Sequence, residues 1–172
     1  ENTEITCTQH YDYYKNYVVN CMGNHGTIAL RKAIERSCNY YFAEVGRRTG
    51  INTMYLYAEK FGLGVKTGLE VDENVGVLAG RDSTTWYEGN TVQAAIGQSD
   101  NTFTTVQLAT YVATIANNGV RYKTHLVRKI TDYERENTVL YNDPEKPTVM
   151  ADAEISKDNL QIVKEGMRQV VT

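Results

Sequence analysis

The stretch that decides the fold runs from residue 33 to residue 42 and reads Ala33-Ile34-Glu35-Arg36-Ser37-Cys38-Asn39-Tyr40-Tyr41-Phe42. Apolar residues recur at helical spacing on both sides of Ser37, which predicts amphipathic helical structure. Taken alone, Ser37 and Asn39 are typical of a helix junction, because Ser and Asn are common turn and cap residues. Cys38 lies between them at helical spacing, and we expect its thiol to point away from them and to serve packing.

Helical periodicity and end signals extend outward from this stretch. They predict helices after Thr27, over residues 52–61, after Thr104 or Thr105, and after Ser156. Residues 65–90 are predicted to form a long surface segment. Residues 125–131 alternate as a strand does, and residues 138–141 are the predicted hairpin partner. The sequence therefore predicts a mostly helical chain with at most one β-ladder.

Length, charge and composition exclude several classes of protein. The 172 residues amount to one domain, and 41% apolar with 23% charged residues is the composition of an ordinary globular protein. A net charge of −3 without a basic stripe argues against a nucleic-acid partner. The longest apolar runs are far shorter than the roughly 20 residues needed to cross a bilayer, so we expect no membrane span in this chain.

The motifs around Ser37 follow an order that resembles the transpeptidase domain of penicillin-binding proteins. The matching segments are Ser37-x-Asn39, His25-Gly26-Thr27, the run from Tyr55 to Gly68, Ile96-Gly97-Gln98, and the run from Gln107 to Gly119. The resemblance covers about residues 20 to 130 and is closest to the class B proteins, the D,D-transpeptidases that cross-link peptidoglycan. It implies an α/β fold of the serine β-lactamase type, of which this chain would be a predominantly helical portion with an incomplete sheet.

The family's chemistry uses three motifs, and this chain carries one of them. Ser-x-x-Lys supplies the nucleophile and its base, Ser-x-Asn supplies a proton relay and a substrate-holding amide, and Lys-Thr-Gly binds the substrate carboxylate. No Ser-x-x-Lys precedes Ser37, and Lys66-Thr67-Gly68 follows a helix stop too soon after Ser37 to be the third motif. We therefore expect a fragment that begins after the nucleophile, ends before the carboxylate-binding strand, and is inactive alone.

Ser37 and Asn39 are the candidate catalytic residues that the resemblance implies. Ser37 would relay a proton to or from the leaving amine, and Asn39 would hydrogen-bond the acyl side-chain amide of a substrate or drug. No cofactor would be required for catalysis. The expected partners of the complete domain are peptidoglycan stem peptides and β-lactams, on the outer face of the bacterial plasma membrane. The alternative is a non-catalytic binding or scaffold module derived from the same fold.

On this interpretation, residues 1–172 form one partial transpeptidase domain with three segments. Residues 1–26 have no clean period and are expected to be irregular, with a metal as one way to order them. Residues 27–119 form the helical subdomain that carries the Ser-x-Asn motif. Residues 120–172 form a hairpin and a helix leading to the missing sheet strand. Faces that normally meet this sheet would be exposed and would favour self-association.

The first segment also has the spacing of a metal site. Cys7 and His10 form one pair with two residues between them, Cys21 and His25 form another with three residues between them, and ten residues separate the pairs. Zinc favours four such ligands with short internal spacings. Some clostridial class B proteins resemble this pattern, with Cys7, Cys21 and His25 matching best and His10 or Asp12 as the fourth ligand. A Cys7–Cys21 disulfide and free thiols are the alternatives.

Overall fold

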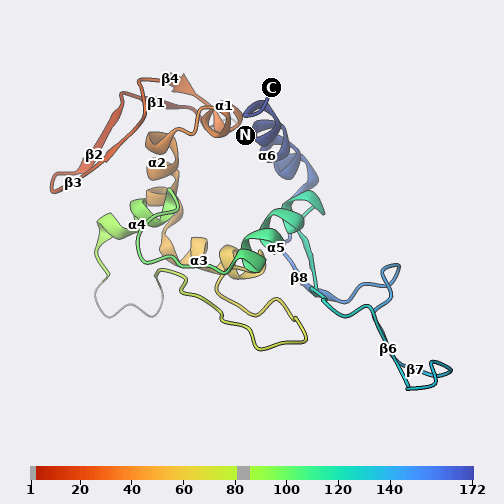
Figure 1. The fold of residues 1–172 in the computed structure, drawn as a ribbon. Helices are drawn as coiled ribbons and strands as arrows, with labels where there is room; N and C mark the ends of the chain where they lie inside the picture. The colour runs from red at the N-terminus through yellow and green to blue at the C-terminus, as the bar shows by residue number, and fades with distance from the viewer. Residues whose placement is uncertain (1–2, 81–85) are drawn as a thin grey trace.

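The computed structural model describes residues 3–80 and 86–172, which contain eight strands and six helices (Figure 1). The strands are β1 (Ile5–Cys7), β2 (His10–Tyr14), β3 (Tyr17–Asn20), β4 (Gly26–Ile28), β5 (Val120–Tyr122), β6 (Lys129–Thr131), β7 (Thr138–Tyr141) and β8 (Val149–Asp152). The helices are α1 (Leu30–Glu35), α2 (Asn39–Thr49), α3 (Ile51–Lys60), α4 (Glu88–Ala95), α5 (Thr105–Ala116) and α6 (Lys157–Gln169).

The strands pair two by two, as β1–β4, β2–β3, β5–β8 and β6–β7, all antiparallel. This corrects the expectation of a single β-ladder. The described part of residues 1–26 is not irregular either, since it contains β1, β2, β3 and the start of β4. Ile5 pairs with Ile28 and Cys7 with Gly26, so the partners lie far apart in the sequence and no local periodicity announces them.

The predicted hairpin of residues 125–131 and 138–141 is present but shorter. Only Lys129–Thr131 forms the first strand, and it pairs with β7. The backbone just before this strand does not pair with β7, because the amides of Leu126 and Val127 donate instead to a Glu70 carboxylate oxygen at 3.0 and 3.4 Å. The β6–β7 hairpin projects from the rest of the molecule (Figure 1).

Capping explains why two of the predicted helices form where they do. Thr104 and Gln107 make a reciprocal capping box at the start of α5, and Asn117 ends that helix. The Ser156 hydroxyl accepts from the Asn159 amide at the start of α6. Helix α3 lies within one residue of its predicted range, but it begins after Gly50 and has no side-chain cap. The helix expected after Thr27 begins only at Leu30, because residues 26–28 belong to β4.

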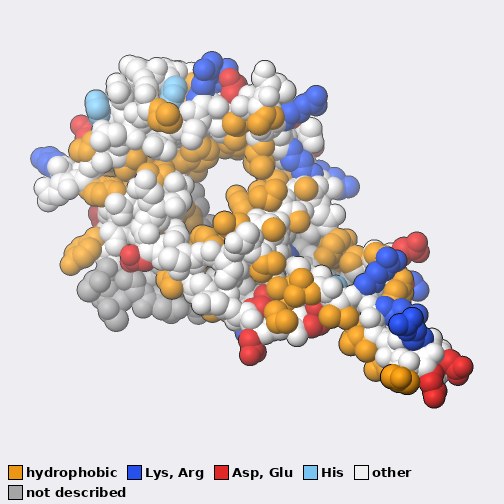
Figure 2. Space-filling view, in the orientation of Figure 1, with side chains coloured by type: hydrophobic (Ala, Val, Ile, Leu, Met, Phe, Trp, Pro, Cys, Tyr) orange, Lys and Arg blue, Asp and Glu red, His pale blue; other side chains and the backbone are white. Residues whose placement is uncertain are grey.

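The helices follow one another around a ring (Figure 1). Helix α2 contacts α3 and α4, α5 contacts α6, and α6 closes the ring against α1, where Arg31 forms an ion pair with Glu165 at 2.9 Å. Figure 2 shows an open passage through this ring with hydrophobic side chains along its rim. Apolar side chains around an opening are surface that another packed element could bury.

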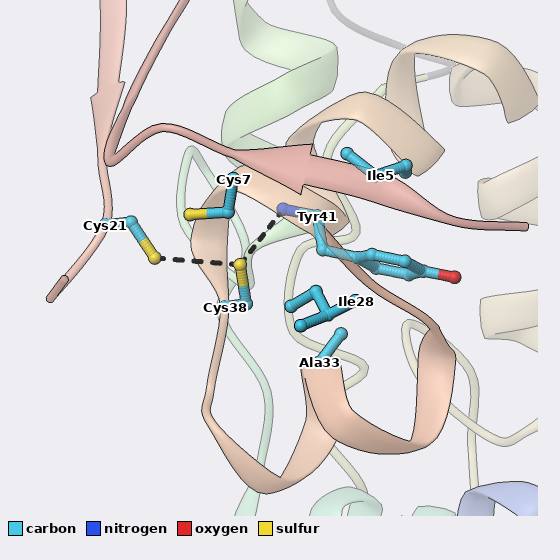
Figure 3. Packing of buried hydrophobic residues seen from close by; sticks show 7 residues of the cluster. All are labelled: Ile5, Cys7, Cys21, Ile28, Ala33, Cys38 and Tyr41. Atoms are coloured by element: carbon cyan, nitrogen blue, oxygen red, sulfur yellow. Dashed lines mark hydrogen bonds between the residues drawn. The ribbon is translucent and has the colours of Figure 1, made fainter. Parts of the chain in front are cut away.

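The core beside the Ser-x-Asn stretch is built where β1 and β4 pack on α1 and α2. Figure 3 shows its buried residues, which are Ile5, Cys7, Cys21, Ile28, Ala33, Cys38 and Tyr41. A neighbouring cluster joins the β2–β3 hairpin to α2 and α4 through Tyr11, Val19, Ala43 and Val92. These two clusters fix α2 at its first turns. Among the described residues, no helix has the length and apolar character required to span a membrane.

Candidate functional site

The Ser-x-Asn stretch lies at the break between α1 and α2. Two hydrogen bonds end α1: the Ser37 amide donates to the Ile34 carbonyl at 3.0 Å, and the Cys38 amide donates to the Ala33 carbonyl at 2.9 Å. This is the bonding pattern of a Schellman motif, in which glycine commonly takes the left-handed position. Here Ser37 takes it, with a φ of +49°. A serine held in this conformation stores backbone strain of the kind that clusters at active sites.

The Ser37 and Asn39 side chains are both reachable from solvent, Ser37 being exposed and Asn39 half-buried. The Asn39 amide nitrogen donates to the Asn20 carbonyl oxygen at 3.0 Å. Because a carbonyl oxygen only accepts, this bond orients the Asn39 carboxamide and anchors it to the end of β3. The two candidate residues are therefore held at an open helix junction and are not part of a dry interior.

In the Lys66-Thr67-Gly68 stretch, Thr67 and Gly68, with the following Leu69, bind a carboxylate from within the chain. The Glu73 carboxylate accepts from the Thr67 amide at 2.8 Å, the Thr67 hydroxyl at 2.6 Å, the Gly68 amide at 2.8 Å and the Leu69 amide at 3.0 Å. Burial opposes the charge on Glu73, but these hydrogen bonds outweigh it and lower the pKa of Glu73. Thr67 is fully buried. Since Glu73 takes these donors, this stretch stabilises a loop and does not present a substrate-binding edge.

Three cysteines and one histidine meet beside the Ser-x-Asn stretch. The Cys7, Cys21 and Cys38 thiols converge in Figure 3, and the four ligand atoms, with the Nδ1 of His25, all lie within 4.8 Å of one another. The Cys21 and Cys38 sulfurs are 3.8 Å apart, and His25 Nδ1 lies 3.5 Å from the Cys21 sulfur and 3.7 Å from the Cys7 sulfur. All three cysteines are buried and free.

These separations fit tetrahedral zinc. Zinc–sulfur bonds of about 2.3 Å and a zinc–nitrogen bond of about 2.0 Å at tetrahedral angles imply sulfur pairs about 3.8 Å apart and sulfur–nitrogen pairs about 3.5 Å apart. A disulfide needs sulfurs about 2.05 Å apart, so the Cys7–Cys21 bridge that the sequence left open is not formed. Without a metal, burial raises the pKa of Cys38 to about 12 and keeps its thiol protonated.

The structure changes the expected ligand set at one position. His10 does not join the group, because its Nδ1 bonds the Asn20 side-chain oxygen at 2.8 Å on the β2–β3 hairpin. Asp12 is exposed on β2 and also lies outside the group. The fourth member is Cys38, which the sequence assigned to packing. The sequence offered one signal for Cys38, namely that its thiol was expected to point away from Ser37 and Asn39. Nothing in the sequence indicated that Cys7 lies beside Cys38, because only the long-range pairing of β1 with β4 brings the two together.

Comparison with known proteins shows the family of this chain. The family model for the penicillin binding protein transpeptidase domain matches residues 1–172. The chain belongs to this family. Penicillin-binding protein 2A of Bacillus subtilis is 30% identical over 166 residues, covering 87% of this chain and 23% of that protein. Peptidoglycan D,D-transpeptidase MrdA of Haemophilus influenzae is 31% identical over 157 residues, covering 86% of this chain and 23% of that protein.

Solved structures give the same fold. Pseudomonas aeruginosa PBP2 aligns with a TM-score of 0.79 at 27% identity, over 99% of this chain and 39% of that chain. Penicillin-binding protein A of M. tuberculosis, solved as an imipenem acyl-enzyme complex, aligns with a TM-score of 0.83 at 21% identity and supports the fold alone. The chain thus spans about a quarter of the length of its curated relatives. It is a mixed α/β portion of a penicillin-binding-protein transpeptidase domain, with small, incomplete sheets.

Proposed function

We propose that this chain is part of a peptidoglycan D,D-transpeptidase that cross-links stem peptides through a serine acyl-enzyme and is acylated by β-lactams. The observation that carries the proposal is the Ser37–Asn39 junction: a strained, exposed serine beside a carboxamide tied to β3, in a chain of this family. The nucleophile and the carboxylate-binding strand would come from other parts of the same protein. That domain would act on the outer face of the plasma membrane.

Each candidate residue has a role that suits its place. The nucleophilic serine adds to the substrate carbonyl, and its proton must reach the amine of the departing residue. The exposed Ser37 hydroxyl both donates and accepts, so it suits a relay of that proton. The Asn39 carboxamide, oriented through the Asn20 carbonyl, suits alignment of the substrate's amide beside the reacting bond. The passage through the ring is where we place the helix that carries the nucleophile.

Labelled penicillin tests the proposal. The 172-residue chain should form no covalent adduct, whereas the longer protein containing it should form one adduct per chain, read by intact mass. A stoichiometric adduct on the chain alone would contradict the assignment of the nucleophile to another segment. If the longer protein forms no adduct while remaining folded, the non-catalytic scaffold module replaces the transpeptidase.

We propose further that Cys7, Cys21, His25 and Cys38 hold one structural zinc ion. The supporting observation is the fit of their separations to a tetrahedral site, with donors of the types that zinc prefers. Such an ion would link β1, the turn after β3 and the first turn of α2, and so would rigidify the backbone on which Ser37 and Asn39 lie. The ligands act there as thiolates and a neutral imidazole.

Metal analysis separates zinc from free thiols. Protein purified without chelator should contain one zinc per chain, and Cys38→Ala should lose it. His10→Ala is the matched control, because His10 lies outside the group, and it should retain the ion. Three reactive thiols in wild-type protein that contains no metal would overturn the zinc proposal and leave the transpeptidase proposal unaffected.

A further inference from the structure

The β6–β7 hairpin projects from the rest of the molecule with its surface uncovered. Strand β7 is exposed at all four of its residues, and β6 is exposed at Lys129 and Ile130. Figure 2 shows hydrophobic side chains lying among the charged ones on this hairpin. In the described part of the chain, β6 and β7 pair only with each other. A two-stranded sheet alone is at best marginally stable in water, so this hairpin needs support.

One carboxylate supports the hairpin at its base. A Glu70 oxygen lies 2.8 Å from His125 Nδ1, and the Asn142 side-chain nitrogen donates to the same oxygen at 3.2 Å. The other Glu70 oxygen accepts from the Leu126 amide at 3.0 Å. These bonds tie the segments before β6 and after β7 to the loop that carries Glu70. The base of the hairpin is therefore anchored, whereas its two strands remain uncovered.

The outer edge of β7 has unpaired backbone groups. At the base of the hairpin, the Asn142 amide donates to the Arg128 carbonyl at 2.9 Å. Residues of an antiparallel ladder alternate between hydrogen-bonded and non-hydrogen-bonded pairs, so Leu140 bonds β6 as Asn142 does. The N–H and C=O groups of Val139 and Tyr141 therefore face away from β6. Among the described residues, no other strand pairs with this edge.

Only the β7 edge is suited to pairing with a further strand. Strand β7 has four residues and contains neither a charged residue nor a proline. Strand β6 has three residues, contains Lys129, follows Arg128, and has a register irregularity after Ile130. Charged residues, short length and bulges are the features that prevent pairing at sheet edges. The β6 edge is thus protected, and the β7 edge is open.

We propose that the β7 edge pairs with the β7 edge of a second copy of this chain, antiparallel and about a two-fold axis. In the register centred on Leu140, Val139 lies opposite Tyr141 of the second copy, and each such pair exchanges both of its N–H···O bonds. Pairs of a β-branched and an aromatic residue stabilise sheets. Because β7 has no charged residue, no like charges face each other between the two strands.

The same register joins the apolar pairs on one face of the hairpins. Ile130 lies opposite Leu140, and these side chains are 46% and 37% exposed. Since Leu140 lies opposite Leu140 of the second copy, the two Ile130–Leu140 pairs form one continuous apolar stripe. The strand thus complements itself, which is why a second copy is the occupant. The edge is short, so we expect a weak, concentration-dependent dimer. This inference does not depend on the proposed function.

Cysteine cross-linking locates the contact. Leu140 would face its own copy in a non-hydrogen-bonded pair, whose Cα atoms lie about 4.5 Å apart, within the range that a disulfide spans. Leu140→Cys should therefore form a covalent dimer with oxidised glutathione, read on a non-reducing gel. Tyr133→Cys is the matched control, because Tyr133 is fully exposed at the hairpin tip and the two tips point in opposite directions. It should cross-link at least about tenfold less. The native cysteines are buried, so wild-type protein should stay monomeric on this gel.

A proline tests the backbone pairing itself. Val139→Pro removes an N–H that faces away from β6, so the β6–β7 ladder keeps its own bonds. In the Leu140→Cys background it should lower cross-linking by about tenfold. Val139→Thr keeps both the N–H and the branched side chain, and it should cross-link as the parent does. Slow hydrogen exchange of the Ile130 amide, measured by NMR, would confirm that the hairpin is folded in each variant.

Three results would overturn the pairing of β7 edges. They are a Leu140→Cys protein that stays monomeric, equal cross-linking of Leu140→Cys and Tyr133→Cys, and undiminished cross-linking in a folded Val139→Pro variant. In the longer protein, protection of the Val139 and Tyr141 amides from exchange at every dilution would show that another segment covers the edge, and would also reject the dimer. Penicillin acylation tests the proposed function separately.

Discussion

At the scale of single residues, Ser37 adopts a backbone conformation that glycine adopts more easily. The left-handed region costs a residue with a Cβ roughly 1–2 kcal/mol, while glycine loses roughly 0.5–1 kcal/mol in conformational entropy on folding. Ser37, with its φ of +49°, therefore stands where stability alone would favour glycine. A hydroxyl retained at this position is consistent with a functional role.

The first prediction follows from this conformation. Ser37→Gly should raise the free energy of unfolding by up to about 1 kcal/mol relative to Ser37→Ala, because only glycine removes the Cβ from the left-handed region. Urea denaturation of the two variants measures the difference. A glycine variant less stable than the alanine variant would contradict the strain at this junction.

The second prediction concerns the pH dependence of stability, through the carboxyl group of Glu44. Its folded pKa of about 2, lowered chiefly by hydrogen bonds from Arg47, lies below the value of about 4.3 for an unfolded glutamate. Its contribution to stability is therefore complete above about pH 4.3 and is lost as the pH falls toward 2. The free energy of unfolding, measured by urea denaturation, should decline over this window. The Glu44→Gln variant should lose less unfolding free energy over this pH range than the wild type. An equal loss in the two proteins would contradict the low pKa of Glu44.

At the scale of elements, the crossing of α2 and α4 depends on one glycine. A Cβ on Gly46 would overlap the Cβ of Ala95, so only glycine allows this close approach. Gly46→Ala gains helix propensity of about 1 kcal/mol, but overpacking costs about 1–3 kcal/mol. The difference is about 0–2 kcal/mol, and we expect net destabilisation of about 1 kcal/mol by urea denaturation. Gly23→Ala, with nothing within 4 Å of the added Cβ, is the control. Equal stability of the two variants would show that the helices do not cross so closely.

The elements also show what the sequence could predict. Helices α3, α5 and α6 were predictable because their apolar period is a local signal, as are the caps Thr104 of α5 and Ser156 of α6. Strands β1 and β4 were not, because three-residue strands that pair across the chain leave no periodic pattern. The pairing of β1 with β4 also determines which residues meet in the cysteine–histidine cluster. The spacing in the sequence identified Cys7 and Cys21, whereas Cys38 joins them only through the packing of β1 on α2.

At the scale of the whole molecule, the ring leaves apolar surface uncovered. Its passage has a hydrophobic rim, and several large apolar side chains are exposed, including Leu56, Leu108 and Val112. Surfaces of this kind in a soluble domain mark places where another element packs. We therefore predict that the 172-residue chain self-associates, with a sedimentation coefficient that rises with concentration. A monodisperse monomer across that range would count against it.

Under the proposed function, Ser37 would form part of one wall of a larger active site. The most direct test is the rate constant for acylation by a labelled penicillin in the longer protein that contains this chain. Ser37→Ala should lower that constant by roughly 10²–10⁴-fold, while Ser156→Ala, which removes only the α6 cap, should leave it unchanged. A folded Ser37→Ala protein that is acylated at the wild-type rate would contradict the account.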